Sequence, residues 1–124
     1  MSLVYETFHI EGKVISKDNA RHFNKYGRSY LPKKFKDYEN NVAMQVKPQV
    51  RKIYSCDIVV YTDFYMKNKK HCDLCNLTKS LYDSLNGILW VDDRQIKECA
   101  LRVIYNKLAL EGARITVLKK DNIW

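Results

Sequence analysis

The chain has 124 residues, 46% of them apolar and 12% aromatic, which suits one domain with a packed core and excludes a disordered chain. Its 22 basic and 14 acidic residues give a formal charge of +8, which indicates an anionic partner such as nucleic acid. No apolar run is long enough to cross a bilayer and no signal-peptide pattern opens the chain, so we expect a cytoplasmic protein without a membrane partner.

The N-terminal part of the chain predicts a strand or hairpin and, further on, a helix. Residues 4–10 alternate in character and carry β-forming side chains, and the turn residues Glu11 and Gly12 follow. The helix should begin near Pro32 and end at Pro48, because proline suits the first turn of a helix and interrupts a later one. Its expected apolar face consists of Phe35, Tyr38, Val42, Met44 and Val46.

Between these elements, residues 17–34 form a predicted surface loop that is polar and basic, with aromatic residues interleaved. A loop of this length in a small domain is uncommon and usually functional. Cations and aromatic rings together suit phosphates and exposed bases, which makes Arg21, Lys25 and Arg28 candidates for DNA binding. A solvated, mobile loop is the alternative interpretation.

The middle of the chain predicts a strand followed by a second helix. Residues 53–66 carry apolar side chains on both faces around Asp63, which indicates a central strand. After a basic turn at residues 67–71, leucines recur at helical spacing from near Asp73 until the Asn86-Gly87 pair ends the helix.

The C-terminal part predicts further strands and completes the fold class. An apolar run leads to Trp90, which we assign to the core, and β-forming residues follow at 101–105 and 113–118. Strands precede and follow the helices without a strict strand–helix alternation. We therefore expect one compact α+β domain over residues 1–124, with a mixed or antiparallel sheet and two main helices.

A polar stripe runs along the second predicted helix. Cys75, Lys79 and Asp83 follow one another every four residues and so share one face, away from the leucines. The simplest interpretation is an ordinary amphipathic helix with an ion pair between Lys79 and Asp83, which contributes roughly 0.3 to 0.5 kcal/mol. The residues around the stripe point to a more specific interpretation.

Three neighbouring segments carry that interpretation: Asp73-Leu74-Cys75-Asn76-Leu77-Thr78-Lys79, then Tyr82-Asp83-Ser84-Leu85-Asn86-Gly87, then Trp90-Val91-Asp92-Asp93-Arg94-Gln95-Ile96. Together they resemble the RusA family of Holliday-junction resolvases, whose signature is D-x-D-N-L-x-K, an L-D-A-L-N-G-like turn and W-x-D-D-x-Q-V. The close match covers about residues 73 to 96, and Asn19 in the early loop adds weaker support and joins the candidates for DNA binding.

The resemblance implies a homodimeric endonuclease that binds four-way DNA junctions and nicks two opposed strands with a divalent metal, usually Mg²⁺. Asp73 and Asp93 match the metal-binding carboxylates, and Lys79 matches the essential basic residue of the same reaction centre. Asp92 and Asn76 match supporting positions, with Asp92 a further candidate metal ligand. Clustered carboxylates repel one another, so the grouping requires a cation or a raised pKa.

Cys75 departs from the family pattern, because it stands where the family has its second aspartate. Mg²⁺ prefers oxygen ligands, and sulfur is a poor replacement for a carboxylate. Three explanations stay open: Asp92 or Asp83 compensates, a softer metal such as Mn²⁺ is used, or the protein binds junctions without cutting them.

Basic residues precede the candidate centre and suggest contact with the DNA backbone. The run Lys67, Lys69, Lys70 and His71 would draw phosphates towards the carboxylates, although a solvated basic turn is the alternative. Cys72 and Cys75 also form a Cys-x-x-Cys pair, which fits a zinc or thiol-based regulatory module if His71, Cys56 or Cys99 completes the site. Without a secretory segment, we expect four free thiols.

Overall fold

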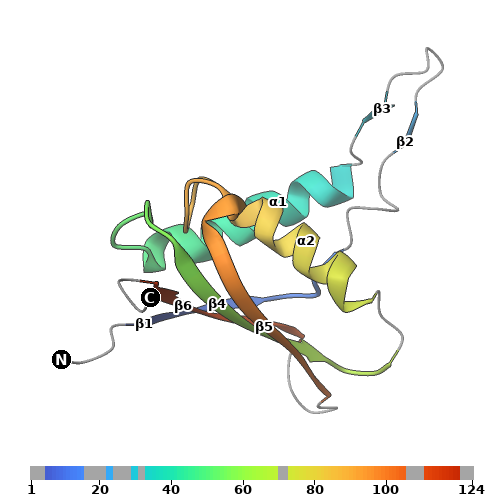
Figure 1. Cartoon of the computed structure of the whole chain (residues 1–124). Helices are drawn as coiled ribbons and strands as arrows, with labels where there is room; N and C mark the ends of the chain where they lie inside the picture. Colours follow the sequence, from blue (N-terminus) through green and yellow to red (C-terminus); the bar gives the residue numbers. More distant parts are fainter. Residues whose placement is uncertain are drawn as a thin grey trace.

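In the computed structural model of the chain, the described residues are 5–15, 33–69, 73–105 and 111–120, with the backbone of 22–23 and 29–30. In chain order the elements are β1 (Tyr5–Glu11), β2 (His22–Phe23), β3 (Ser29–Tyr30), α1 (Lys33–Val46), a 3₁₀ turn (Lys47–Gln49), β4 (Ile58–Met66), α2 (Leu74–Leu85), a second 3₁₀ turn, η2 (Asp93–Gln95), β5 (Ile96–Tyr105) and β6 (Gly112–Lys119) (Figure 1).

The main sheet has four strands in the order β1-β6-β4-β5. β4 runs parallel to β5 and antiparallel to β6, and β1 runs antiparallel to β6, so the expected mixed sheet is confirmed. The predicted strand at residues 4–10 forms, but its partner is the C-terminal strand β6 rather than a local hairpin. β4 is central as predicted, since it is hydrogen-bonded on both sides.

Both helices cover the same face of this sheet and enclose the core (Figure 1). In α1 the buried residues are Phe35, Tyr38, Val42 and Val46, which recur every three or four positions. Met44, which we expected on this face, is 76% exposed. It follows Val42 by two residues, about 200° around a helix, and therefore points to the opposite side.

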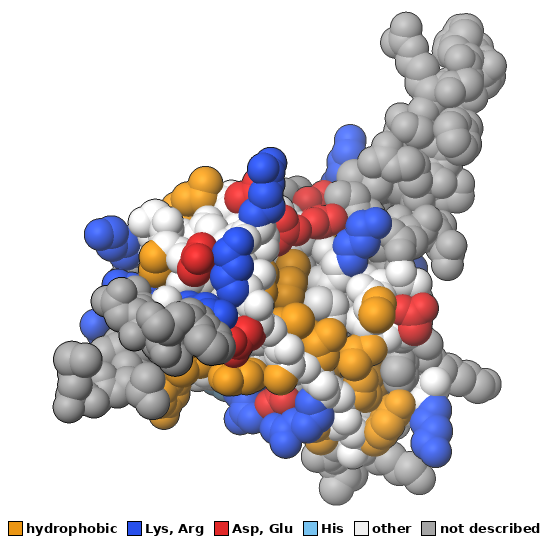
Figure 2. Space-filling model, in the orientation of Figure 1, with side chains coloured by type: hydrophobic (Ala, Val, Ile, Leu, Met, Phe, Trp, Pro, Cys, Tyr) orange, Lys and Arg blue, Asp and Glu red, His pale blue; other side chains and the backbone are white. Residues whose placement is uncertain are grey.

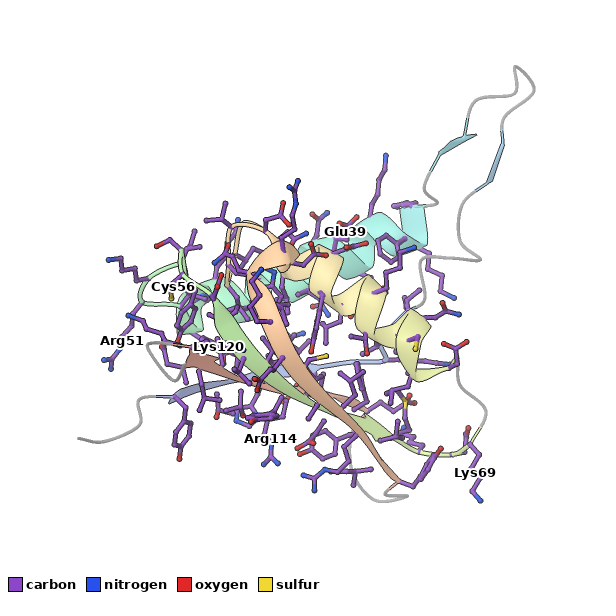
Figure 3. The ribbon with its side chains drawn as sticks, in the orientation of Figure 1. Glu39, Arg51, Cys56, Lys69, Arg114 and Lys120 are labelled. Carbon is purple, nitrogen blue, oxygen red and sulfur yellow. The ribbon has the colours of Figure 1, made fainter. Side chains whose placement is uncertain are left out.

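The side chains of β4 alternate between the two faces of the sheet. Val60, Thr62, Phe64 and Met66 are buried beneath the helices, whereas Asp63 and the 47%-exposed Tyr61 lie on the other face. Arg114 projects from this uncovered face, away from the helices (Figure 3). The uncovered face is polar and charged, so the core lies wholly on the helical side.

The connection β4-α2-β5 positions the candidate site. Because β4 and β5 are parallel, α2 must carry the chain back along the sheet from the end of one strand to the start of the other. Ile58 pairs with Ile96 at one end and Met66 with Tyr105 at the other. α2 thus begins near the Met66 end and finishes near the Ile58 end.

The remaining expectations are met in part. The predicted loop 17–34 contains a short antiparallel pairing, His22 with Tyr30 and Phe23 with Ser29, and α1 begins at Lys33. Cys56, Cys75 and Cys99 are free, while Cys72 lies outside the described residues. Across the described parts of the chain, the helices are too short and too polar to span a membrane.

Candidate active site

Asp73 begins α2 and is the N-cap of this helix. One carboxylate oxygen accepts a 2.9 Å hydrogen bond from the backbone N–H of Asn76, and the other accepts a 3.1 Å bond from the Asn76 side-chain amide. Both contacts hold the exposed carboxylate in one orientation at the positive end of the helix dipole. The Asp-x-x-Asn spacing of the motif therefore has a structural role in addition to any chemical one.

The predicted polar stripe of α2 is present on the surface. Cys75 and Lys79 are exposed and Asp83 is half-buried, while the opposite face buries Leu77, Leu81, Tyr82 and Leu85. Tyr82 reaches across to the sheet, where its hydroxyl lies 2.8 Å from that of Thr62 in β4. This contact fixes the rotation of α2, and with it the direction in which the stripe points.

After α2 the chain makes a tight turn that brings Asp92 and Asp93 to the end of the helix. Gly87 adopts a positive φ of 80°, and its N–H donates to the carbonyl of Trp90 at 2.6 Å. The buried Trp90 indole donates to the Asn86 side chain at 2.7 Å and meets the ring of Tyr82 edge-on. The Asn-Gly and Trp parts of the motif are thus structural, and the assignment of Trp90 to the core is confirmed.

Gln95 holds the Asp92-Asp93 segment against the body of the protein. Its side-chain oxygen accepts from the backbone N–H groups of Val91 and Asp92, both at 2.9 Å. Its amide nitrogen donates to the carbonyls of Tyr54 and Cys56 at 2.8 and 2.9 Å. With Asp92 as N-cap, this arrangement is a capping box, a signal readable from the Asp-x-x-Gln spacing that the sequence analysis did not use.

The two adjacent carboxylates have opposite pKa shifts. The backbone N–H of Arg94 and a hydrogen bond with Asp93 lower the pKa of Asp92 below its usual value. Partial burial, the hydrogen bond with Asp92 and the negative charges of Asp92 and Asp83 raise the pKa of Asp93. Asp83, Asp92 and Asp93 therefore form a region of concentrated negative charge, and a bound cation would relieve the repulsion.

α2 separates Asp73 from this acidic region within one chain. Asp73 precedes the first residue of α2, and Asp93 follows the turn after its last residue. A 12-residue helix is roughly 18 Å long at about 1.5 Å per residue. The structure therefore brings Asp83, Asp92 and Asp93 together and leaves Asp73 and Cys75 at the other end of α2, with Lys79 between them.

The donor atoms at both ends suit a hard divalent cation in type. Asp73, Asp92 and Asp93 offer carboxylate oxygens, whereas the Cys75 sulfur does not fit Mg²⁺. Among the residues that the structure describes, no three His, Cys, Asp or Glu side chains come together as a ready metal site. The donor chemistry fits, and the residues of one chain supply it in two separate parts.

The candidate DNA-binding residues fall in two groups. Lys67 and Lys69 are exposed on the turn after β4, and Figure 3 shows Lys69 near the start of α2. The others, Asn19, Arg21, Lys25, Arg28, Lys70 and His71, lie outside the residues whose side chains are described. Cys72, half of the proposed zinc pair, also lies outside them.

The sequence analysis missed a cationic cleft at the opposite end of the molecule. Arg51, Lys52 and Lys119 line a cavity of about 710 Å³, and Arg51 lies far from Lys69 in Figure 3. Glu6, the acidic residue in its wall, accepts a hydrogen bond from the Tyr54 hydroxyl. Lys119 is distant in sequence from the adjacent pair Arg51 and Lys52, and all three lie outside the motif, so no local pattern reveals the cleft.

Comparison with known proteins identifies the family. Residues 11–118, which include every candidate residue from Asn19 to Asp93, match the family described as Endodeoxyribonuclease RusA. No curated protein matches the chain. The match extends beyond the short motifs to nearly the whole domain, and the observed four-stranded sheet with two covering helices agrees with the expected fold. The chain therefore belongs to the RusA endodeoxyribonuclease family.

Proposed function

We propose that the protein is a homodimeric, metal-dependent endodeoxyribonuclease that resolves Holliday junctions in the cytoplasm by nicking two opposed strands. The observation that supports this most directly is the family match over residues 11–118, with Asp73, Lys79 and Asp93 all at the surface. The formal charge of +8 adds the attraction that a phosphate backbone requires.

In this proposal each group has a distinct role. Asp73 and Asp93, supported by Asp92, hold Mg²⁺ or Mn²⁺ through carboxylate oxygens. A divalent ion at such a site polarises a phosphodiester and lowers the pKa of a bound water. Lys79 places a positive charge where negative charge develops on the phosphate or on the leaving oxygen. Lys67 and Lys69 attract the DNA backbone towards the start of α2.

The direct test is cleavage of a labelled synthetic four-way junction in Mg²⁺ or Mn²⁺. The native chain should produce paired, symmetric nicks, and Asp73→Asn and Asp93→Asn should each abolish them while leaving junction binding measurable. A Glu39→Gln variant serves as the control, because Glu39 is a half-buried acidic residue of α1 outside the motif. Cleavage that survives both Asn substitutions would refute the proposed site.

A second candidate function rests on Cys75 alone. Its sulfur is exposed at the place of an expected aspartate, so the native chain would bind junctions without cutting them. Cys75→Asp separates the two candidates in the same assay. Nicking by the native chain favours the enzyme, whereas nicking only after Cys75→Asp identifies a junction-binding protein that has lost turnover.

A further inference from the structure

The cationic cleft described above has no role in the proposed function. Arg51, Lys52 and Lys119 line it together with one carboxylate, that of Glu6, which accepts a hydrogen bond from the Tyr54 hydroxyl. Figure 2 shows basic side chains at this end of the molecule, where Figure 3 labels Arg51. The three cations are exposed, and within the described residues none of them has an ion-pair partner. The cleft therefore presents three positive charges to an anionic ligand.

The cleft also exposes an aromatic and an aliphatic side chain. Tyr5 is 62% exposed and Ile53 is 41% exposed, and both line the cavity. A cationic groove with aromatic rings is the pattern of proteins that bind a single nucleic-acid strand without sequence preference, because every base can stack on a ring. A small anion such as inorganic phosphate uses the cations alone and leaves both side chains in water. The exposed ring therefore favours a ligand that carries bases as well as phosphates.

The size of the cleft distinguishes one strand from a duplex. A cavity of about 710 Å³ is roughly 9 Å across, which is less than the ~12 Å width of the major groove of B-DNA, so a duplex cannot enter it. A single strand can enter, with its phosphates on the cations and its bases against Tyr5 and Ile53.

One segment of the chain forms a wall of the cleft and also contacts the acidic region. Residues 53–56 line the cavity, and the carbonyls of Tyr54 and Cys56 accept hydrogen bonds from the amide nitrogen of Gln95. The oxygen of the same amide accepts from the backbone N–H of Asp92. Of the described residues that line the cleft, none belongs to the three motif segments. The cleft is therefore close to the acidic region but separate from it.

We propose that this cleft binds single-stranded DNA. Arg51, Lys52 and Lys119 bind phosphates of the strand, while its bases stack on Tyr5 and pack against Ile53. The inference rests on the cleft itself and needs neither a metal ion nor cleavage. Joined to the proposed function, it gives the enzyme a preference for DNA branches that carry an unpaired strand.

Binding measured in EDTA tests the cations. Fluorescence anisotropy should show that the native chain binds a labelled oligo(dT) of about 12 nucleotides. The triple variant Arg51→Gln/Lys52→Gln/Lys119→Gln should lose about tenfold or more in affinity. Its dependence of log K on log salt should become shallower by about 2, since each phosphate contact to a single strand contributes about 0.7. Binding to a duplex of the same length should fall much less. A native chain that does not bind oligo(dT), or equal losses for strand and duplex, would overturn the proposal.

A second triple variant controls for net charge. Lys13→Gln/Lys36→Gln/Lys97→Gln removes the same three charges from exposed positions outside the cleft, in three different parts of the chain. It should weaken oligo(dT) binding by less than about threefold, because long-range attraction in salt is largely screened. Circular dichroism checks that both triple variants fold. If both lose affinity equally, net charge alone explains the binding and the cleft has no part in it.

Tyr5 distinguishes a DNA strand from a small anion. Tyr5→Ala should weaken oligo(dT) binding by about fivefold or more, whereas Tyr5→Phe keeps the ring and should bind as the native chain does. Inorganic tripolyphosphate, used as a competitor, should displace the strand equally well from the native chain and from Tyr5→Phe. If Tyr5→Ala binds oligo(dT) as tightly as the native chain, the cleft is an anion site only and the assignment to a single strand fails.

Cys56 reports where the strand lies. It is partly exposed and lines the cleft, whereas Cys99 is exposed on β5 outside it. Saturating oligo(dT) should slow the alkylation of Cys56 several-fold and leave that of Cys99 unchanged, as measured by peptide mass spectrometry. Unchanged alkylation of Cys56, or equal protection of both thiols, would overturn the proposal. Nicking of junctions by a chain that fails these binding tests refutes the cleft alone, while oligo(dT) binding without nicking refutes the proposed function alone.

Discussion

Asp63 and Arg114 form a 2.6 Å ion pair on the uncovered face of the sheet, and Arg102 donates to both oxygens of the same carboxylate, at 2.9 and 3.1 Å. Asp63 is only 14% exposed, although Arg102 is largely in solvent. Changing Asp63 to Asn should therefore lower the free energy of unfolding by about 1 to 2 kcal/mol, because two guanidinium groups lose the negative charge and one of two acceptor oxygens, while solvent screens part of the electrostatic stabilisation. Urea denaturation measures the difference in unfolding free energy, and a loss below a few tenths of a kcal/mol would contradict this prediction.

The same pair predicts an acid-dependent loss of stability. Hydrogen bonds from Arg102, and then Arg114, lower the pKa of Asp63 in the folded protein. A lowered folded pKa means that the stabilisation is fully present above the unfolded value, near 4, and is lost as the pH falls further. The stability difference between native and Asp63→Asn should be constant from pH 7 to about 5 and shrink below about 4. A difference that grows on acidification would be inconsistent with this ion pair.

Asp73 has a structural role as the N-cap of α2 and a proposed chemical role, and two substitutions distinguish them. Asn keeps the N-cap acceptor, so Asp73→Asn should leave the urea midpoint almost unchanged while abolishing metal-dependent nicking. Ala removes the cap as well, and Asp73→Ala should cost about 1 kcal/mol in addition. If Asp73→Asn loses as much stability as Asp73→Ala, the cap accounts for the residue and its chemical role needs other support.

Asp93 should destabilise the metal-free protein. Burial, Asp92 and Asp83 raise its pKa, which shows that its negative charge is unfavourable in the folded state. Asp93→Asn should therefore raise the thermal midpoint measured in EDTA, and it should remove the further rise that we expect Mn²⁺ to give the native chain. Asp57→Asn is a suitable control, because Asp57 is an exposed aspartate that precedes β4. A lower midpoint in EDTA would contradict the repulsion.

Gln95 should contribute more to the free energy of unfolding than a polar side chain usually does. Its amide bonds four backbone groups from two segments. Gln95→Leu removes all four bonds, and only the Val91 N–H and the Tyr54 carbonyl keep a bond, the 3.3 Å one to each other. We expect a loss of about 2 to 3 kcal/mol in urea denaturation, with Gln95→Glu intermediate because it retains only the acceptor function. A cost below 1 kcal/mol would show that water replaces the amide at this position.

The sequence predicted the helices and most strands because their signals are local. Asp73, the recurring leucines and Asn86-Gly87 mark both ends of α2, and the structure agrees within a residue or two. The partner of β1 was not predictable in the same way, because β6 lies about a hundred residues further along and no short-range pattern encodes the pairing. Met44 was misplaced because its neighbours at two positions before and after it, Val42 and Val46, lie on the buried face of α1.

The sequence motif names the candidate site residues but does not predict their geometry. The motif places Asp73 and Asp93 twenty residues apart, and reading it as a single cluster ignores the stiff helix between them. The role of Gln95 and the cationic cleft around Arg51 depend on tertiary contacts, which no spacing in the sequence shows.

The length of α2 has a consequence for the proposed metal site. A helix is stiff, so the number of residues in α2, rather than a flexible loop, sets how far Asp73 lies from Asp92 and Asp93 within one chain. One added helical turn would lengthen that separation by about 5.4 Å. Metal binding that needs both ends of α2 should therefore be sensitive to insertions in this helix, whereas surface loops usually tolerate them.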